Sequence, residues 1–162
     1  MSSSYKQSES TRKPVVVVGL GNTLMRDEAI GVRIVQALEA AGSQFPDAEF
    51  ADYGTAGMRV LHGIAGRRKA VIVDCARMDA PPGTIRRFTP DQVTSIKRMP
   101  GFSLHEGDFL SVLKLSEQLG EAPDEVIIFG IEPAVVDSGE ELSELLRSNF
   151  DSYLETVRQE IA

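Results

Sequence analysis

Four consecutive valines that run into a glycine turn constrain the fold of this chain more than any other feature. Residues 15–21 read VVVVGLG, and the acidic pair Asp27 and Glu28 follows before a helical pattern begins. A continuously apolar, β-branched run favours a central parallel strand that is covered on both faces. Open α/β sheets start with such a strand, turn and helix, and they bind ligands at the carboxyl ends of their strands. Glu28 is therefore a candidate for chemistry at that edge of the sheet.

Strand and helix patterns alternate along the rest of the chain. We expect strands at residues 14–20, 48–53, 70–73 and 126–129, with Asp74 ending the third of them, and an edge strand at 84–89. The last helical pattern runs from Leu142 to Val157 and predicts one long helix. This alternation predicts an α/β fold, namely a three-layer α/β/α sandwich with a central, mostly parallel, twisted sheet.

Local signals mark where two of the helices begin. Asp27 fits the N-cap of the first helix. Ser103 and Glu106 fit a capping box at the entry to a later helix, with Ser103 at the N-cap. Residues 90–101 form a long connection, and because such connections are often functional in compact domains, we expect a specificity loop there.

Length, charge and cysteine content limit the classes of protein to consider. The chain has 162 residues, which predicts one domain over 14–162 after a polar, serine-rich and disordered tail at 1–13. Its net charge of −7 argues against nucleic acid or an anionic membrane as partner. No apolar run approaches the roughly 20 residues of a membrane span. Cys75 is the single cysteine, so no internal disulfide forms, and we expect a cytoplasmic monomer.

Three polar side chains fall where this architecture gathers ligands. Glu28 follows the first strand, Asp74 ends the third, and His105 enters a later helix. One imidazole and two carboxylates form a mixed nitrogen and oxygen set that can hold a divalent transition metal with positions left open. Each residue also has a structural interpretation: Glu28 favours the positive end of its helix, Asp74 accepts from loop donors, and His105 is an ordinary first-turn residue.

Other candidates for chemistry are weaker. Cys75 is a possible thiol nucleophile with His105 as its base, although buried cysteines at strand ends are usually inert. His62 fits a surface or packing role. The opening glycine turn begins like a dinucleotide fingerprint, but Leu24 stands where the third glycine is required, so we expect no nucleotide cofactor.

At this point the chain resembles the hydrogenase maturation proteases, the endopeptidases that trim the large subunit of [NiFe] hydrogenases. The first family motif is matched by residues 19–31, GLGNTLMRDEAIG, and the second by residues 52–57, with Tyr53 where a glycine is common. The remaining motifs are matched by Asp74, by Ser103-Leu104-His105, and by Gly130-Ile131-Glu132-Pro133 with Gly139, Leu142 and Ser143. These matches keep the family's order and cover almost all of the chain after residue 13.

The resemblance implies a nickel-dependent endopeptidase that removes a C-terminal extension from its partner, the [NiFe] hydrogenase large subunit precursor. Nickel would belong to the substrate, so the isolated enzyme need not carry it. The resemblance gives catalytic and metal-contacting roles to Glu28, Asp74 and His105, and possible substrate contacts to Asp52, Gly54 and Thr55. Asp52 also suits a turn-forming role.

Two alternatives stay open. Peptidyl-tRNA hydrolases also open with a strand and a Gly-Leu-Gly-Asn turn, but their later proline and Arg-His-Asn segment do not occur here, and a charge of −7 suits tRNA poorly. A nickel checkpoint or metallochaperone that does not cut its partner would use the same ligands as the protease. Neither a Ser-His-Asp set nor a His-Glu-x-x-His motif is present, so serine-protease and zincin mechanisms are not expected.

Overall fold

The computed structural model describes residues 12–54, 57–96, 102–104 and 107–162. Within these ranges a central sheet has the strand order β2-β1-β3-β6-β4, and β5 pairs only with the far end of β3. Strands β2, β1, β3 and β6 are parallel, and β4 runs antiparallel to β6 at one edge. The bounds are β1 Val15–Leu20, β2 Ala48–Gly54, β3 Lys69–Met78, β4 Ile85–Phe88, β5 Phe102–Leu104 and β6 Glu125–Ile131.

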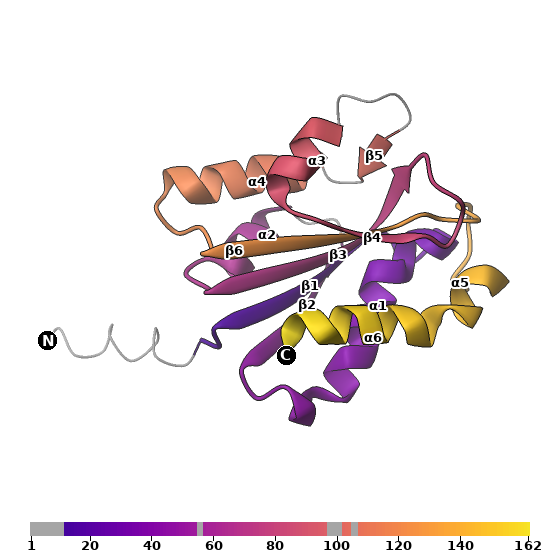
Figure 1. Ribbon diagram of the computed structural model, residues 1–162, viewed down its shortest axis with the longest axis horizontal. Coiled ribbons are helices and arrows are strands. Elements are labelled where there is room, and N and C mark those ends of the chain that lie inside the picture. Colours follow the sequence, from indigo (N-terminus) through magenta and orange to yellow (C-terminus); the bar gives the residue numbers. More distant parts are fainter. Residues whose placement is uncertain (1–11, 55–56, 97–101, 105–106) are drawn as a thin grey trace, which may run out of the picture.

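Helices cover both faces of the sheet (Figure 1). The face called here the α1 face packs against α1 (Ile30–Ala40), α5 (Glu144–Ser148) and α6 (Phe150–Ile161). The α4 face packs against α2 (Gly57–Ile64), α3 (Pro90–Ile96) and α4 (Gly107–Gln118). Short 3₁₀ helices lie at η1 (Arg26–Ala29) and η2 (Gly42–Gln44). The predicted α/β/α sandwich with a mostly parallel sheet is confirmed. None of the helices in the described ranges has the length and apolar composition to cross a bilayer.

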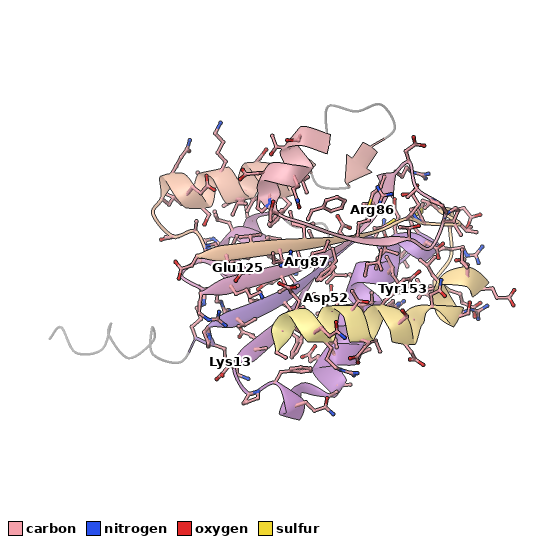
Figure 2. The ribbon with its side chains drawn as sticks, viewed as in Figure 1. Lys13, Asp52, Arg86, Arg87, Glu125 and Tyr153 are labelled. Atoms are coloured by element: carbon pink, nitrogen blue, oxygen red, sulfur yellow. The ribbon has the colours of Figure 1, made fainter. Side chains whose placement is uncertain are left out.

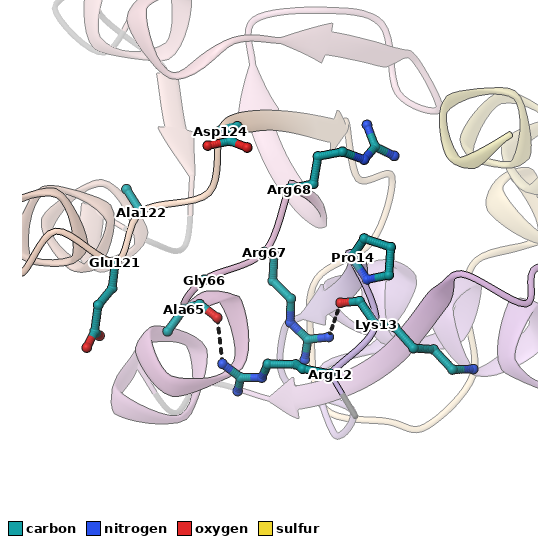
Figure 3. Close-up of a pocket in the computed structure, with 10 residues that line it drawn as sticks. All are labelled: Arg12, Lys13, Pro14, Ala65, Gly66, Arg67, Arg68, Glu121, Ala122 and Asp124. Atoms are coloured by element: carbon teal, nitrogen blue, oxygen red, sulfur yellow. Dashed lines mark hydrogen bonds between the residues drawn. The ribbon is translucent and has the colours of Figure 1, made fainter. Parts of the chain in front are cut away.

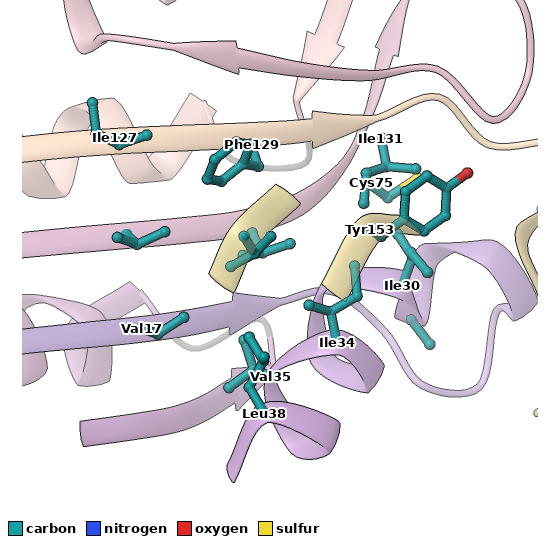
Figure 4. Packing of buried hydrophobic residues seen from close by; sticks show 14 of the residues in the cluster. Val17, Ile30, Ile34, Val35, Leu38, Cys75, Ile127, Phe129, Ile131 and Tyr153 are labelled. Atoms are coloured by element: carbon teal, nitrogen blue, oxygen red, sulfur yellow. The ribbon is translucent and has the colours of Figure 1, made fainter. Parts of the chain in front are cut away.

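The valine run of β1 is buried on both sides, as its composition predicts. Val15 and Val17 belong to the apolar cluster of the α1 face, and Val16 and Val18 belong to that of the α4 face. Successive side chains point to opposite faces of a strand, so one run supplies both cores. Figure 4 shows the α1-face cluster, in which side chains of the helices meet those of the strands: Val17, Ile30, Ile34, Val35, Leu38, Ile127, Phe129 and Tyr153.

The structure corrects two predictions around β3. The strand does not end at Asp74 but continues to Met78, and β5 pairs antiparallel with this extension. Ser103 lies in β5 opposite Arg77, and α4 begins only at Gly107. The capping box with Ser103 at the N-cap is therefore wrong, because the backbone of Ser103 is part of a strand pair. Its other predicted member, Glu106, lies outside the described residues.

Three further local predictions change. Asp27 does not cap α1, whose N-cap is Ala29, and the Asp27 carboxylate binds a distant loop instead. One long final helix was expected, but the structure has two helices that meet at Asn149. The apolar period continues across this break, so the sequence pattern does not reveal it. The connection expected at 90–101 begins with helix α3, and its last residues, 97–101, lie outside the described part of the chain. Residues 1–11 of the predicted tail lie outside it as well.

Three glycines allow η1 and α1 to lie directly on the ends of β1 and β3. A Cβ atom on Gly31 would overlap the carbonyl oxygen of Val73, and one on Gly19 would lie 2.7 Å from the carbonyl oxygen of Gly31. A Cβ on Gly21, whose φ is 133°, would overlap the carbonyl oxygen of Glu28. Only glycine permits such close approach of backbone to backbone. The spacing of glycines in residues 19–31 thus sets where Glu28 lies.

We predict that Gly31→Ala lowers the free energy of unfolding by at least about 2 kcal/mol, because the new methyl group forces α1 away from β3. Chemical denaturation measures this change. Gly42→Ala is the matched control, since no atom lies within 4 Å of the added Cβ there, and its effect should stay below about 1 kcal/mol. Equal losses in the two variants would contradict the close contact.

Candidate functional site

The turn that follows β1, residues 21–25, is held against the end of β2 and leads into η1. The amide of Gly21 donates to the carbonyl oxygen of Gly54 at 3.0 Å. Within the turn, the amide of Leu24 donates to the side chain of Asn22 at 2.9 Å. Glu28, in η1, is partly buried at this carboxyl edge of the sheet. The turn therefore presents Glu28 at the edge where the sequence predicted a site.

Asp74 lies inside β3, opposite Gly130 of β6, and its side chain is fully buried. Strand alternation places it on the α4 face, with its neighbours Ile72 and Ala76. Helix η1, which carries Glu28, contacts β3. Two of the three predicted ligands thus come from segments that meet at this edge.

The pKa of the Cys75 thiol is raised by its surroundings at this end of β3. Burial raises its pKa far above the usual value, and the nearby carboxylates of Asp74, Glu28 and Asp27 raise it further, against a smaller opposing effect of Arg77. The pKa of this thiol is therefore raised both by burial and by carboxylates on β3 and η1. The site is acidic, as a cation-binding edge requires.

His105 and Thr55, two of the residues predicted for the site, lie outside the described residues. The described residue just before His105 is Leu104, which pairs with Ala76, two residues beyond Asp74. Among the residues that the structure does describe, no three His, Cys, Asp or Glu side chains form a group able to hold a metal ion. The described part of the site is therefore a pair of carboxylates, Glu28 and Asp74, and not a complete metal centre.

Asp27 is a buried carboxylate whose role the sequence did not predict. One oxygen, Oδ1, accepts from the amide of Ser143 at 2.7 Å. The other, Oδ2, accepts from the amides of Ala134 at 2.9 Å and Val135 at 2.8 Å. Its own amide donates to the carbonyl oxygen of Val135 at 3.1 Å. Charge-assisted bonds of this kind offset the cost of burying a carboxylate. They also tie η1 to the loop between β6 and α5.

Arg26, at the start of η1, is held in a strained conformation by the same loop. Its φ of 47° is in the left-handed region, which costs a residue other than glycine about 1 kcal/mol. Its amide donates to the carbonyl oxygen of Gly139 at 2.9 Å, and its Nε donates to the carbonyl oxygen of Glu141 at 3.1 Å. In return the amide of Gly139 donates to the carbonyl oxygen of Leu24 at 2.9 Å. These contacts compensate for the strain.

Asp52 and Gly54 lie at the end of β2, where the second motif was matched. The exposed Asp52 accepts from the amide of Gly54 and from the side chain of Gln36 on α1, both at 3.3 Å. Gly54 has a φ of 57°, so the bond from its amide closes a turn of the kind that Asp52 was expected to form. Figure 2 labels Asp52 among the side chains around the sheet. Its contact with Gln36 places it on the α1 face, whereas Asp74 lies on the α4 face.

Tyr53, where the resembled family commonly has glycine, packs on α2. A Cβ atom on Gly63 would overlap the phenol oxygen of Tyr53, so the ring lies flush against the helix backbone. Tyr53 also joins the apolar cluster of the α4 face. The departure from the family pattern is therefore accommodated by a glycine on the facing helix.

A hollow of about 680 Å³ lies at the opposite edge of the sheet, beside the starts of β1 and β3 (Figure 3). Basic residues line much of it, but the guanidinium of Arg67 is buried and already bonded. It donates to the carbonyl oxygens of Gly63 at 3.0 Å and Lys13 at 2.7 Å, and pairs with the carboxylate of Glu49. This hollow is remote from the strand ends that carry Glu28 and Asp74, and it is not part of the candidate site.

Comparison with known proteins decides which family has this fold and these motifs. Residues 32–160 match the family model described as hydrogenase maturation protease. The hydrogenase 2 maturation protease of Escherichia coli (strain K12) is 33% identical over 147 residues, which cover 88% of this chain and 87% of that protein. The chain belongs to the hydrogenase maturation protease family. It is therefore a peptidase, and this membership excludes the peptidyl-tRNA hydrolase alternative.

Two further members of the family are similar over different lengths. The structure of the hydrogenase maturating endopeptidase HybD from E. coli superposes with a TM-score of 0.77 and 32% identity, over 88% of each chain. The hydrogenase expression/formation protein HupD of Thiocapsa roseopersicina is 32% identical over 123 residues, which are 76% of this chain but 56% of that protein. The chain thus spans little more than half the length of that relative. The family-model match begins after Glu28, so the placement of Glu28 rests on the fold and on the first motif.

Cys75 is predicted to be dispensable for peptidase activity in this family member. It is 4% exposed within the α1-face cluster, and its raised pKa keeps the thiol protonated at neutral pH, which argues against a nucleophilic thiolate. The other weak candidate, His62, is exposed on α2, which fits the predicted surface role. Cys75→Ala should retain activity within about threefold and lose about 1 kcal/mol of stability. Iodoacetamide should label the unfolded chain but not the native one at pH 7.5. A folded Cys75→Ala protein without activity would revive the thiol mechanism.

Proposed function

We propose that this chain removes a C-terminal extension from the precursor of a [NiFe] hydrogenase large subunit. Membership of the maturation protease family supports this proposal, since the E. coli relative is named as the protease of hydrogenase 2. The observation that carries it to particular residues is the meeting of two motif segments at one sheet edge. Helix η1, which carries Glu28, contacts β3, which carries Asp74.

We further propose that Glu28, Asp74 and His105 contact a nickel ion that the precursor carries. Carboxylate oxygens and an imidazole nitrogen suit a divalent nickel ion. Asp74 is fully buried in β3, the strand that η1 contacts, which supports a second carboxylate at the edge that carries Glu28. The position of Leu104, opposite Ala76, supports His105 as the third ligand, since the chain leaves β5 two residues beyond the level of Asp74.

The three contacts would supply both recognition and orientation. Holding the scissile peptide in one geometry can lower the barrier by several kcal/mol. Glu28 is partly exposed whereas Asp74 is fully buried, so Glu28 is the carboxylate better placed to accept a proton from attacking water. A nickel ion held by these residues would supply a Lewis acid for the scissile carbonyl. We also keep Asp52, Gly54 and Thr55 as proposed substrate contacts, because the end of β2 is bonded to the turn that leads to Glu28.

The proposal is tested with nickel-loaded precursor and mass spectrometry of the large subunit. Glu28→Gln, Asp74→Asn and His105→Ala should each slow release of the C-terminal peptide by at least about 100-fold, because each removes a ligand that orients the substrate. Glu39→Gln is the matched control, since Glu39 is an exposed acid on α1 away from the edge, and it should cleave at the parent rate. Normal cleavage by a variant that combines all three substitutions would reject the assigned site. No cleavage of several cognate precursors by the intact protein would reject the function.

Nickel recognition has a test of its own. The precursor prepared without nickel should stay uncut, and loading it with nickel before adding the enzyme should restore cleavage, because the metal completes the contact with the carboxylates. Equal cleavage rates with and without nickel would be consistent with peptidase activity but would exclude nickel as the feature that the enzyme recognises in the precursor. A stable complex with nickel-loaded precursor and no change of mass would instead favour the checkpoint alternative.

A further inference from the structure

The loop between β6 and α5 is bonded to η1 along much of its length. We call residues 134–143 the brace. Near its start it donates two amides to Asp27, and at its end it donates a third, from Ser143. Between these points Gly139 forms a bridge with Met25 and accepts from the amide of Arg26. The brace therefore grips the short segment that precedes Glu28 at several points.

We infer that Asp27 is a positioning residue that sets the place of Glu28 through the brace. This inference rests on the proposed function of Glu28 and adds a residue that touches neither substrate nor metal. The oxygens of Asp27 bond to both ends of the brace, so a rotation of η1 would strain or break these bonds. On the other side, the carbonyl oxygen of Glu28 lies against Gly21, where a Cβ would overlap it. The backbone of Glu28 is thus confined from two directions.

Asparagine is the informative replacement for Asp27, because it keeps the size of the side chain. Each carboxylate oxygen accepts at least one amide N–H: Oδ1 from Ser143, and Oδ2 from Ala134 and Val135. An amide NH₂ group at either position would face a donor and could not accept from it. Asp27→Asn therefore loosens one end of the brace whichever way the side chain is turned.

A double-mutant cycle separates positioning of Glu28 from a general loss of stability. Cleavage of nickel-loaded precursor is measured for the parent, Asp27→Asn, Glu28→Gln and the double variant. Asp27→Asn should lower kcat at least about 10-fold in the parent and less than about twofold in the Glu28→Gln background, because the two residues act as a unit. The same factor in both backgrounds would overturn the inference.

Ser143→Ala is the matched control. Its hydroxyl caps α5 by accepting from the amide of Leu146 at 3.3 Å, whereas its backbone amide, which donates to Asp27, is retained. This variant should lower Tm but keep kcat within about twofold. If it slows cleavage as much as Asp27→Asn does, loss of stability explains both and the inference is wrong.

Gly139→Ala loosens the middle of the brace, where it contacts Met25 and Arg26, and it is used if Asp27→Asn does not fold. Gly139 has a φ of 151°, and a Cβ there would lie 3.1 Å from Cγ of Arg26. Its effect on kcat should also shrink in the Glu28→Gln background. An undiminished effect there would count against the brace as the route to Glu28.

Amide hydrogen exchange gives a measurement that does not depend on cleavage. In Asp27→Asn the amides of Ala134, Val135, Ser143 and Glu28 should exchange faster, whereas in Ser143→Ala they should stay protected. If the parent cleaves no precursor but this pattern appears, the proposed function fails and the positioning of Glu28 stands. If the parent cleaves and the amide of Glu28 stays protected in Asp27→Asn, the inference alone fails.

Discussion

The backbone of Gly31 lies directly on the carbonyl oxygen of Val73, and much of the site depends on this contact. It brings the first turn of α1 onto β3, one residue before Asp74. Any larger residue would lift the helix and carry η1 away from the strand end. The contact therefore joins a packing requirement to the relative position of Glu28 and Asp74. Glycines at 19 and 21 extend the same requirement along β1 and the turn that follows it.

The sheet could be predicted from the sequence because each of its strands carries its own signal. The valines of β1 and the apolar run of β6 are buried on both faces. In a chain whose strand and helix patterns alternate, such short apolar runs indicate central strands of a parallel sheet. The errors came where a local pattern competed with a distant partner. Ser103 fits a helix cap within its own four residues, but its backbone pairs with Arg77, which no local pattern reveals. The extension of β3 beyond Asp74 depends on that same pairing.

The candidate site divides in the same way. Glu28 and Asp74 could be predicted because a parallel sheet brings its carboxyl ends together, and the structure places both at that edge. Asp27 could not be assigned its role, since its partners Ala134, Val135 and Ser143 are 107, 108 and 116 residues away in the chain. The one available signal was that an acidic residue beside Glu28 also began the helical region, and helix capping was the simplest use for it.

Adjacent carboxylates at this edge have different environments, and the difference decides which of them suits a cation. Each oxygen of Asp27 accepts from backbone amides inside the protein, so binding a metal there would break the bonds that hold the brace. Glu28 is partly exposed and follows directly in η1, where its carbonyl lies against Gly21. The neighbouring Cys75 thiol stays protonated at neutral pH, since its pKa is raised by burial and by these carboxylates, and it adds no further negative charge. Asp27 thus serves the structure of the edge, whereas Glu28 is the partly exposed member of the pair and the one that we propose to contact nickel.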